Sequence, residues 1–241
     1  MNYRIVLGLV GTLLSGSATG AEVRATFGGW QYGLTGTATD AGTVYDFQRD
    51  LGVNRDSGRS LQLAWDTGPG WWPDLELTYS GIKASGTRTV PSPPPLPGSR
   101  TLAVAADAVD VDLTARYPWR WNDLSTSLGL TLKQLAGDIR IDDSDQAQPS
   151  RQQFNEIIPQ GQLQLRWHLS RILILGATGQ GIAYDGDRAV EWRAGSELRL
   201  FEPVLVEFGL QEKRYKLTAG DYALDARVRG LYLRVGVAIP R

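Results

Sequence analysis

The stretch that decides the fold is Val109–Tyr117, with the sequence VDVDLTARY. Every second residue from Val109 is apolar or aromatic, and the residues between them are Asp, Asp, Thr and Arg. Successive side chains of a β-strand point to opposite faces, so this pattern predicts a strand with one apolar and one charged face. A water-soluble β-sandwich would also contain such a strand. The rest of the chain must therefore distinguish between the two.

The same period of two recurs along the chain in segments of about ten residues, the length that a tilted transmembrane strand requires. The second clear case is Leu124–Leu132, in which Leu and Thr alternate with Ser, Gly and Thr. Four of the segments show the pattern more weakly. The sequence predicts ten strands, over residues 25–39, 59–65, 74–79, 109–117, 124–132, 162–169, 171–183, 190–200, 204–213 and 224–239.

The connections between these segments alternate between long and short. Long loops are expected over 40–58, 84–101 and 137–156, the second with a stiff polyproline stretch at 91–97. Short connections are expected over 66–72, 118–123, 168–171 and 201–203, and modest ones over 184–187 and 217–223. This alternation puts the long loops at one end of an even-numbered barrel and the turns at the other. The predicted fold is all-β, a closed antiparallel transmembrane β-barrel of about ten strands with up-and-down topology.

Aromatic residues gather at the predicted tight turns. An indole ring is apolar on its face and carries an N–H group that needs water or a lipid headgroup, so tryptophan concentrates at membrane interfaces. In a soluble sandwich we would expect these residues to be spread through the core. The predicted membrane-interface aromatics are Trp65, Trp71, Trp72, Tyr117, Trp119, Trp121, Trp167 and Phe201.

The polar face of each strand must then line the interior. Ten strands enclose a space little wider than that of an eight-stranded barrel, which side chains fill. Charges of both signs face this space in near balance, so we expect them to pair and to plug it. Removing one member, as in Arg193→Ala, should destabilise the barrel more than it changes permeability. The predicted lumen charge network is Asp110, Asp112, Arg116, Lys133, Arg166, Glu191, Arg193, Glu197, Arg199, Glu207 and Lys213.

The first 21 residues have the order of a secretory signal peptide. A short head that contains Arg4 is followed by the apolar run Ile5–Leu14 and by small residues up to Ala21. The run is about half of the roughly 20 residues that a membrane-spanning helix needs. We expect cleavage before Glu22, a barrel domain over 22–241, and export through the periplasm to the cell outer membrane.

The composition excludes several classes of function. The chain has no cysteine, which excludes a lipoprotein anchor, a disulfide framework and Cys/His zinc sites. Its 25 basic and 26 acidic residues give no support for nucleic acid as a partner. The single histidine, His168, falls at a predicted tight turn, and we expect a turn or interface role rather than catalysis. We predict no catalytic residues, no cofactor and no metal site.

One acidic segment leaves an alternative open. Asp138, Asp142, Asp143 and Asp145 crowd the third predicted long loop. Carboxylate oxygens are ligands that divalent cations prefer, but the spacing is irregular, so a solvated acidic loop is the preferred interpretation.

Four short motifs connect the chain to a known group of proteins. They are TFGGWQY at Thr26–Tyr32, YDFQRDLG at Tyr45–Gly52, WPDLELTY at Trp72–Tyr79 and VDVDL at Val109–Leu113. Together they resemble a family of small outer-membrane β-barrel proteins of unassigned function with an N-terminal Gly-Gly motif. The resemblance covers nearly all of the chain after the leader and implies a fold and a location, without catalytic residues. The chain departs from outer-membrane strands in general at Arg241, where an aromatic residue is usual.

These observations favour a monomeric outer-membrane protein with a structural role or a role in the passage of small solutes. Its expected partners are outer-membrane lipid, lipopolysaccharide and the barrel-insertion machinery. One alternative is a barrel hydrolase acting on lipid or peptide at the outer rim. The omptin proteases, which are also ten-stranded barrels, place their acid and histidine chemistry there, where this chain has no histidine. The other alternative is a soluble periplasmic, lipocalin-like binding protein.

Overall fold

The computed structural model describes residues 21–40, 42–53, 55–68, 71–92, 98–145, 149–184, 186–219 and 222–240. Within these residues, ten long strands pair with their neighbours in chain order, and the last strand pairs with the first, so the sheet closes on itself. The predicted fold class is confirmed, and each predicted strand corresponds to one of the ten. The strands are β1 (Glu22–Asp40), β3 (Arg55–Asp66), β4 (Asp74–Pro91), β5 (Ser99–Trp121), β6 (Leu124–Asp143), β7 (Ser150–His168), β8 (Leu173–Tyr184), β9 (Asp187–Phe201), β10 (Val204–Ala219) and β11 (Tyr222–Pro240).

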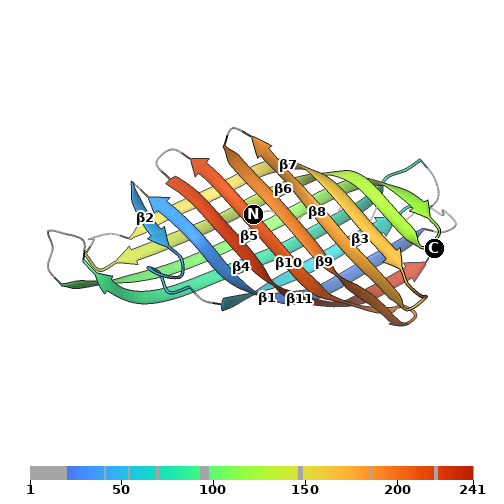
Figure 1. The fold of residues 1–241 in the computed structure, drawn as a ribbon, viewed down its shortest axis with the longest axis horizontal. Helices are drawn as coiled ribbons and strands as arrows, with labels where there is room; N and C mark the ends of the chain where they lie inside the picture. Colours follow the sequence, from blue (N-terminus) through green and yellow to red (C-terminus); the bar gives the residue numbers. More distant parts are fainter. Residues whose placement is uncertain are drawn as a thin grey trace, which may run out of the picture.

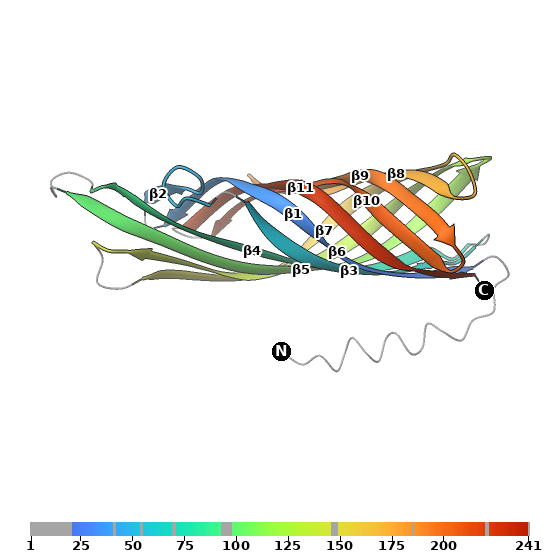
Figure 2. The ribbon, with the colours of Figure 1, turned by 90° about the horizontal axis from the view of Figure 1, so that it is seen from below.

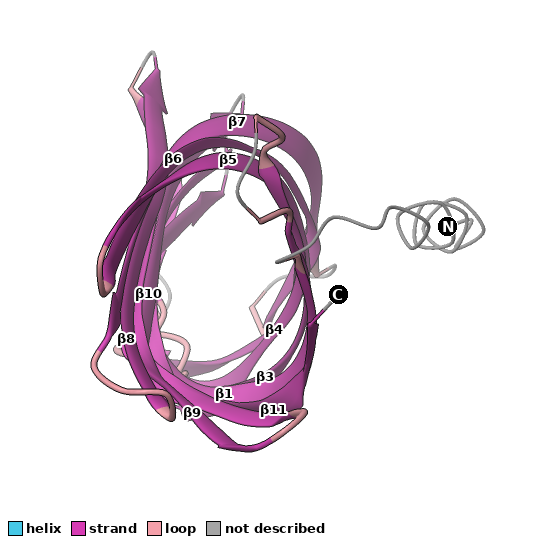
Figure 3. Ribbon diagram, turned by 90° about the vertical axis from the view of Figure 1, so that its right-hand side faces the viewer, coloured by secondary structure: helices cyan, strands magenta, loops and turns pink. Residues whose placement is uncertain are grey.

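The strands run obliquely to the long axis of the barrel, as Figure 1 shows, and the view along that axis shows them as a closed ring (Figure 3). One end carries the connections β3–β4, β5–β6, β7–β8 and β9–β10 together with Glu22 and Pro240. We call it the short-turn end. The opposite end carries the short strand β2 (Thr43–Asp46), which pairs only with the last residues of β1, and we call it the β2 end. No helix among the described residues is long and apolar enough to cross a membrane.

Two of the predicted long loops are wrong in extent, because strands continue through most of them. β4 and β5 pair as far as Pro91 and Ser99, and β6 and β7 pair as far as Ile141 and Ser150. Their outer parts project beyond the barrel wall, since β3 pairs with β4 only along Ser60–Trp65 and β8 pairs with β7 only along Gly161–His168. Figure 2 shows this extension in β4 and β5. The alternation in the sequence fades there because both faces of these segments carry mixed residues.

The interior at the β2 end is apolar, which the sequence did not predict. Inward-facing side chains of several strands pack there against residues of the segment 43–53, which folds back into the mouth of the barrel. Burial of this many apolar side chains is a major source of stability. We call this group the apolar cluster. Its buried members are Trp30, Tyr32, Leu34, Ala38, Tyr45, Phe47, Leu51, Val53, Ile82, Ala84, Leu102, Val104, Ile139, Ile141, Leu224, Ala226, Val228 and Tyr232.

The segment 43–53 is held in place by local hydrogen bonds. The Asp46 carboxylate accepts hydrogen bonds from the backbone N–H groups of Gln48 and Arg49, at 3.0 and 2.7 Å. Asp50 accepts one from the Asp46 N–H at 2.9 Å, and its hydrogen bond from the Arg49 side chain lowers its pKa. The resulting tight turn directs Phe47 inward, and its N–H donates to the carbonyl of Gly36.

The segment also docks closely on β4. A Cβ atom added at Gly86 would lie 2.2 Å from the carbonyl oxygen of Leu51, so only glycine permits this approach. Nearby, where β3 no longer pairs with β4, the side chain of Tyr32 on β1 reaches the backbone of β4. It accepts a hydrogen bond from Lys83 N–H at 2.7 Å and donates one to Lys83 O at 2.5 Å. The apolar cluster thus replaces part of the missing β3–β4 pairing.

Three predictions from the sequence concern residues that the structure does not describe. The expected signal peptide, apart from Ala21, lies outside the described residues, as do Pro93–Pro97 of the polyproline stretch and Arg241.

We predict that Phe47→Ala releases the segment 43–53 from the barrel mouth. Phe47 is almost fully buried, and truncating a buried phenylalanine costs about 3–5 kcal/mol. Trypsin cleavage after the exposed Arg49 of the folded protein should become much faster. Gln48→Ala, which changes an exposed side chain of the same turn, is the control. Equal cleavage rates in the two variants would contradict the packing described above.

Candidate functional site

Between the apolar cluster and the short-turn end, the interior is lined by charged and polar side chains. Alternation along each strand places them there. In β5, for example, the odd-numbered residues face outward, and Asp110, Asp112, Thr114 and Arg116 face inward. The interior charges come from β1, β3, β4, β5, β6, β7, β9, β10 and β11. The fully or nearly buried ones are Arg24, Asp74, Glu76, Asp110, Asp112, Arg116, Lys133, Glu191, Glu197, Lys213 and Arg234.

Lys133 is the centre of the first group of charges, which we call the lysine group. Its side chain is completely buried, and Nζ lies 2.6 Å from Asp112 Oδ1, 2.9 Å from Glu191 Oε1 and 3.4 Å from Asp110 Oδ2. These contacts are ion pairs by distance, without hydrogen-bond alignment. Two strands, β7 and β8, separate β6 from β9 in the ring, so the contact between Lys133 and Glu191 joins strands that do not pair with each other.

Residues from β10 complete the lysine group. Lys213 Nζ donates to the Asp110 carboxylate and, at 3.0 Å, to Ser80 Oγ. The Tyr215 hydroxyl donates to Glu191 Oε1 at 2.6 Å. Every charge in the group therefore has at least one partner of opposite sign, which is the condition under which buried charges are tolerated.

A second group of charges lies nearer the short-turn end, and we call it the arginine group. Arg24 contacts Glu197 at 3.1 Å and Asp66 at 3.5 Å, and Arg166 contacts the same two carboxylates at 2.8 and 3.7 Å. Because β1 and β7 are distant in the ring, these shared carboxylates also bridge the lumen.

Two further arginines extend the arginine group, one toward the short-turn end and one toward the middle of the barrel. Arg199 contacts Glu22 at 2.8 Å and Glu197 at 2.9 Å. Arg116 contacts Glu76 at 2.5 Å. Each arginine has several N–H donors, and carboxylates such as Glu197 contact more than one arginine. The group is therefore a connected network of ion pairs.

Arg193 and Glu207, both expected in the lumen network, are held more loosely. Arg193 lies 3.8 Å from Glu76, and Glu207 lies 3.6 Å from Arg234. Arg234 instead makes its hydrogen bonds with Ser60 and Gln62. Replacing Arg193 should therefore destabilise the barrel less than replacing Lys133.

The structure brings in several interior residues that the sequence analysis left out. Glu76 lies between the apolar Leu75 and Leu77, so alternation alone would place it in the network. Arg24 lies one residue before the predicted strand 25–39 and Arg234 lies within 224–239, and these two weakly patterned segments pair to close the barrel. Gln180 donates hydrogen bonds to Asp112 and Glu191, although its strand is rich in glycine and gives little signal.

The space left between these side chains is small. Two cavities of about 50 Å³ each lie in the charged interior, and Glu76, Thr178 and Arg193 line both. Each has room for a few water molecules. At the short-turn end, a wider vestibule of about 450 Å³ is lined by Asp66, Arg166 and others. The arginine group separates this vestibule from the lysine group.

His168 lies in the wall of the vestibule, at the end of β7. Its backbone N–H donates to the carbonyl of Asp123. The neighbouring hydroxyl of Ser170 accepts hydrogen bonds from the backbone N–H groups of Ile172 and Leu173. These hydrogen bonds to Ser170 stabilise the β7–β8 turn.

Three aspartates of the acidic segment, Asp138, Asp142 and Asp143, lie on β6 rather than in a solvated loop, so that interpretation is wrong for them, and Asp145 lies in the turn after the strand. Asp138 contacts Arg151 at 2.6 Å, Asp142 contacts Arg140 at 3.0 Å, and Asp143 contacts Arg100 at 2.5 Å. Among the described residues, no three His, Asp or Glu side chains are grouped so that they could hold a metal ion.

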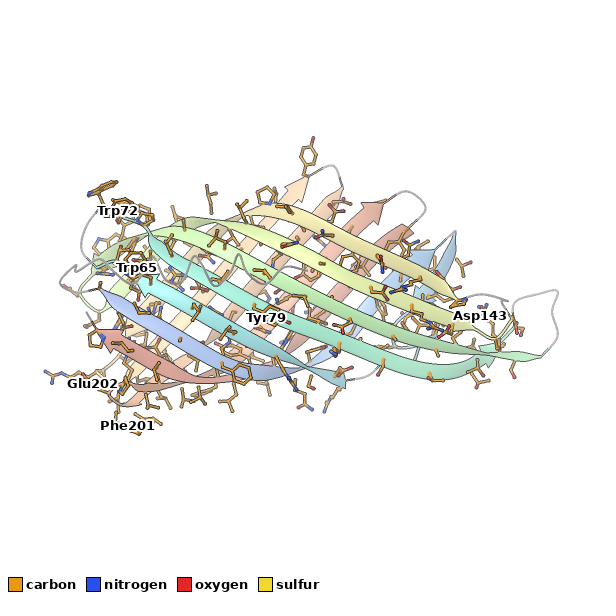
Figure 4. All side chains as sticks on the ribbon, turned by 180° about the vertical axis from the view of Figure 1, so that it is seen from behind. Trp65, Trp72, Tyr79, Asp143, Phe201 and Glu202 are labelled. Carbon is orange, nitrogen blue, oxygen red and sulfur yellow. The ribbon has the colours of Figure 1, made fainter. Side chains whose placement is uncertain are left out.

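The eight expected interface aromatics all lie at or near the short-turn end. Figure 4 labels Trp65, Trp72 and Phe201 at that end and Asp143 at the other. Trp71 and Trp72 stack on each other with ring centroids 4.4 Å apart, and both are exposed. Tyr117, Trp119, Trp121 and Trp167 are also exposed on the outside of their strands.

We predict that Lys133→Ala destabilises the barrel by about 3–5 kcal/mol, because it leaves three carboxylates without their shared cation. Gln134→Ala, which changes the outward-facing neighbour on the same strand, should have little effect. Urea unfolding of the refolded protein in detergent measures the difference. Similar unfolding midpoints for the two variants would show that the lysine group contributes little to stability.

Comparison with known proteins gives a likeness in fold. No protein-family model and no curated protein matches the chain. The chain is similar to the outer membrane protease OmpT from Escherichia coli, with a TM-score of 0.57 and 10% identity over 95% of this chain and 99% of that one. It also matches an outer membrane channel from Pseudomonas putida F1, with a TM-score of 0.43 and 13% identity over 93% and 97% of the two chains. The first likeness shows a shared β-barrel fold.

Proposed function

We propose that the chain is an integral outer-membrane β-barrel protein with a closed interior and a structural or narrow small-solute role. The observation that carries this proposal is the inverted distribution of side chains. Large apolar residues cover the outside, among them Leu128, Leu130 and Leu132 of β6, while charges fill the inside. In water such an exterior would be a large aggregating patch, whereas in hydrocarbon it is the expected surface.

Three further features support a membrane location. The closed sheet pairs the backbone of every long strand on both sides over its central part, as a span in hydrocarbon requires. The aromatic residues at the short-turn end fit one membrane interface, and we assign that end to the periplasm. The expected signal peptide fits export. The family resemblance noted from the sequence remains part of this proposal.

The closed interior favours a structural role over a wide channel. Ion pairs cross the lumen at two levels, between Lys213 and Asp110 and between Arg166 and Asp66. The apolar cluster with the segment 43–53 fills the β2 end. The cavities between them have room only for water or small ions. A lipocalin-like binder would instead have an apolar pocket and a polar exterior.

We also propose that the barrel is not an enzyme. A hydrolase of the outer rim needs a base near the β2 end, but the single histidine lies at the short-turn end. The carboxylates on the outside of β6 near the β2 end form ion pairs, such as that between Asp138 and Arg151.

The proposal predicts that the purified protein shows heat-modifiable migration and is recovered from the outer membrane.

Leu128→Arg should reduce the stability of the inserted barrel by about 2–4 kcal/mol if that residue lies near the midplane. Planar-bilayer recordings of the wild type should show little conductance. A large and stable conductance would contradict the closed interior, and a protein found soluble in the periplasm would contradict the membrane location.

A further inference from the structure

An unusual group of charges lies on the outside of β10 and β11, toward the β2 end. Glu212 is almost fully buried beneath three arginines, although its side chain faces outward. It accepts a hydrogen bond at 2.5 Å from Arg214 Nε and one at 2.8 Å from Arg227 Nη2, and Arg229 Nε lies 3.9 Å away. We call Arg214, Arg227, Arg229 and Glu212 the outer arginine cluster.

The cluster has donors to spare. One carboxylate faces three guanidinium groups, each of which has five N–H donors in a planar arrangement. The arginine side chains are 43 to 56% exposed, while Glu212 is 2% exposed. Arg227 Nε has no hydrogen-bond partner but is buried, so the donors open to the surroundings are those of the exposed ends of the guanidinium groups. The cluster therefore presents a net positive charge with unused donors to its surroundings.

The position of the cluster relates it to the apolar exterior. Directly below Arg229 on β11, five outward residues from Leu231 to Ile239 are apolar and exposed. They cover about 26 Å along the strand, or about 20 Å of height at a tilt of about 40°. An apolar band in such barrels is about 25 Å tall, so Arg229 and its neighbours lie at its upper edge.

The opposite side of the barrel lacks this surplus of positive charge. Near the β2 end of β4 to β7, each outward cation is paired with one carboxylate. Lys83 contacts Asp107 at 3.2 Å, and Arg140 and Arg151 contact Asp142 and Asp138 as described above. The surplus is therefore a local property of β10 and β11 and not of the whole rim.

Neighbouring residues extend the positive surface. Arg188 and Lys216 face each other in the next row toward the β2 end, with Asp225 opposite Lys216 as one further carboxylate. On the other side, Gly33 of β1 lies between Arg229 and Arg55 in the register. A residue without a side chain leaves the space between these two arginines open.

We propose that the outer arginine cluster binds the phosphate groups of a phosphorylated glycolipid of the outer leaflet, of the lipid A type. Guanidinium groups bind phosphate through paired, charge-assisted hydrogen bonds, and acyl chains of the same lipid would lie along Leu231 and the residues below it. The proposal rests on the outer-membrane location proposed above. It specifies which face of the barrel the lipid contacts and through which residues.

The test compares lipid A binding by four forms of the refolded, full-length protein in mixed micelles. The double variant Arg227→Gln, Arg229→Gln should bind about tenfold more weakly or worse, which is the effect of losing one charge-assisted contact. Glu212→Gln should bind more tightly, because it frees donors that the carboxylate now occupies. The matched control, Arg140→Gln with Arg151→Gln on the opposite side, should bind as the wild type does.

Competition distinguishes a lipid from free phosphate. Millimolar inorganic phosphate should leave lipid A bound, and displacement by inorganic phosphate would overturn the assignment to a lipid. Equal binding by the double variant and the wild type, with both forms heat-modifiable, would overturn the site alone. Loss of heat-modifiable migration and of membrane recovery in the wild type would instead overturn the proposed function.

Discussion

The pairing of β1 with β11 is the constraint on which the rest of the structure depends. It runs from Glu22 opposite Pro240 to Thr39 opposite Ala223 and removes both edges of a long sheet. Closure satisfies the backbone in the absence of water and assigns alternate side chains of all ten strands to one narrow interior. Whatever faces inward must then be packed or paired with residues from the opposite wall.

The two halves of the interior meet this requirement in different ways. Toward the short-turn end, Lys213 pairs with Asp110 and Arg166 contacts Asp66, each on a distant strand, so the ion pairs themselves hold opposite walls together. Toward the β2 end, apolar side chains pack against one another instead. The segment 43–53 adds side chains that fill the space left between the ten strands there. Both solutions close the lumen, and both follow from its small diameter.

The sequence predicts the parts of this structure that depend on alternation within a strand. Val109–Tyr117 and Leu124–Leu132 alternate clearly, and both strands, with their charged or polar inner face, could be predicted. The inward packing of Phe47 and Leu51 depends on a turn that reverses the chain into the barrel, which no periodicity reveals. Gln180 and Arg234 were missed because glycine-rich or mixed strands give little contrast between faces. Glu212 breaks the apolar outer pattern of β10, and two of its arginine partners, Arg227 and Arg229, are brought to it by the pairing of β10 with β11.

The central claim is that the apolar exterior faces lipid, and the absence of cysteine from the chain permits a direct test. Single cysteines at Leu113 and Leu128, spin-labelled in protein reconstituted into lipid bilayers, should be more accessible to oxygen than to a water-soluble nickel complex. A label at Arg140, which faces outward on β6 beyond the apolar surface, should show the opposite preference. Nickel accessibility at Leu113 and Leu128 as high as at Arg140 would contradict the account.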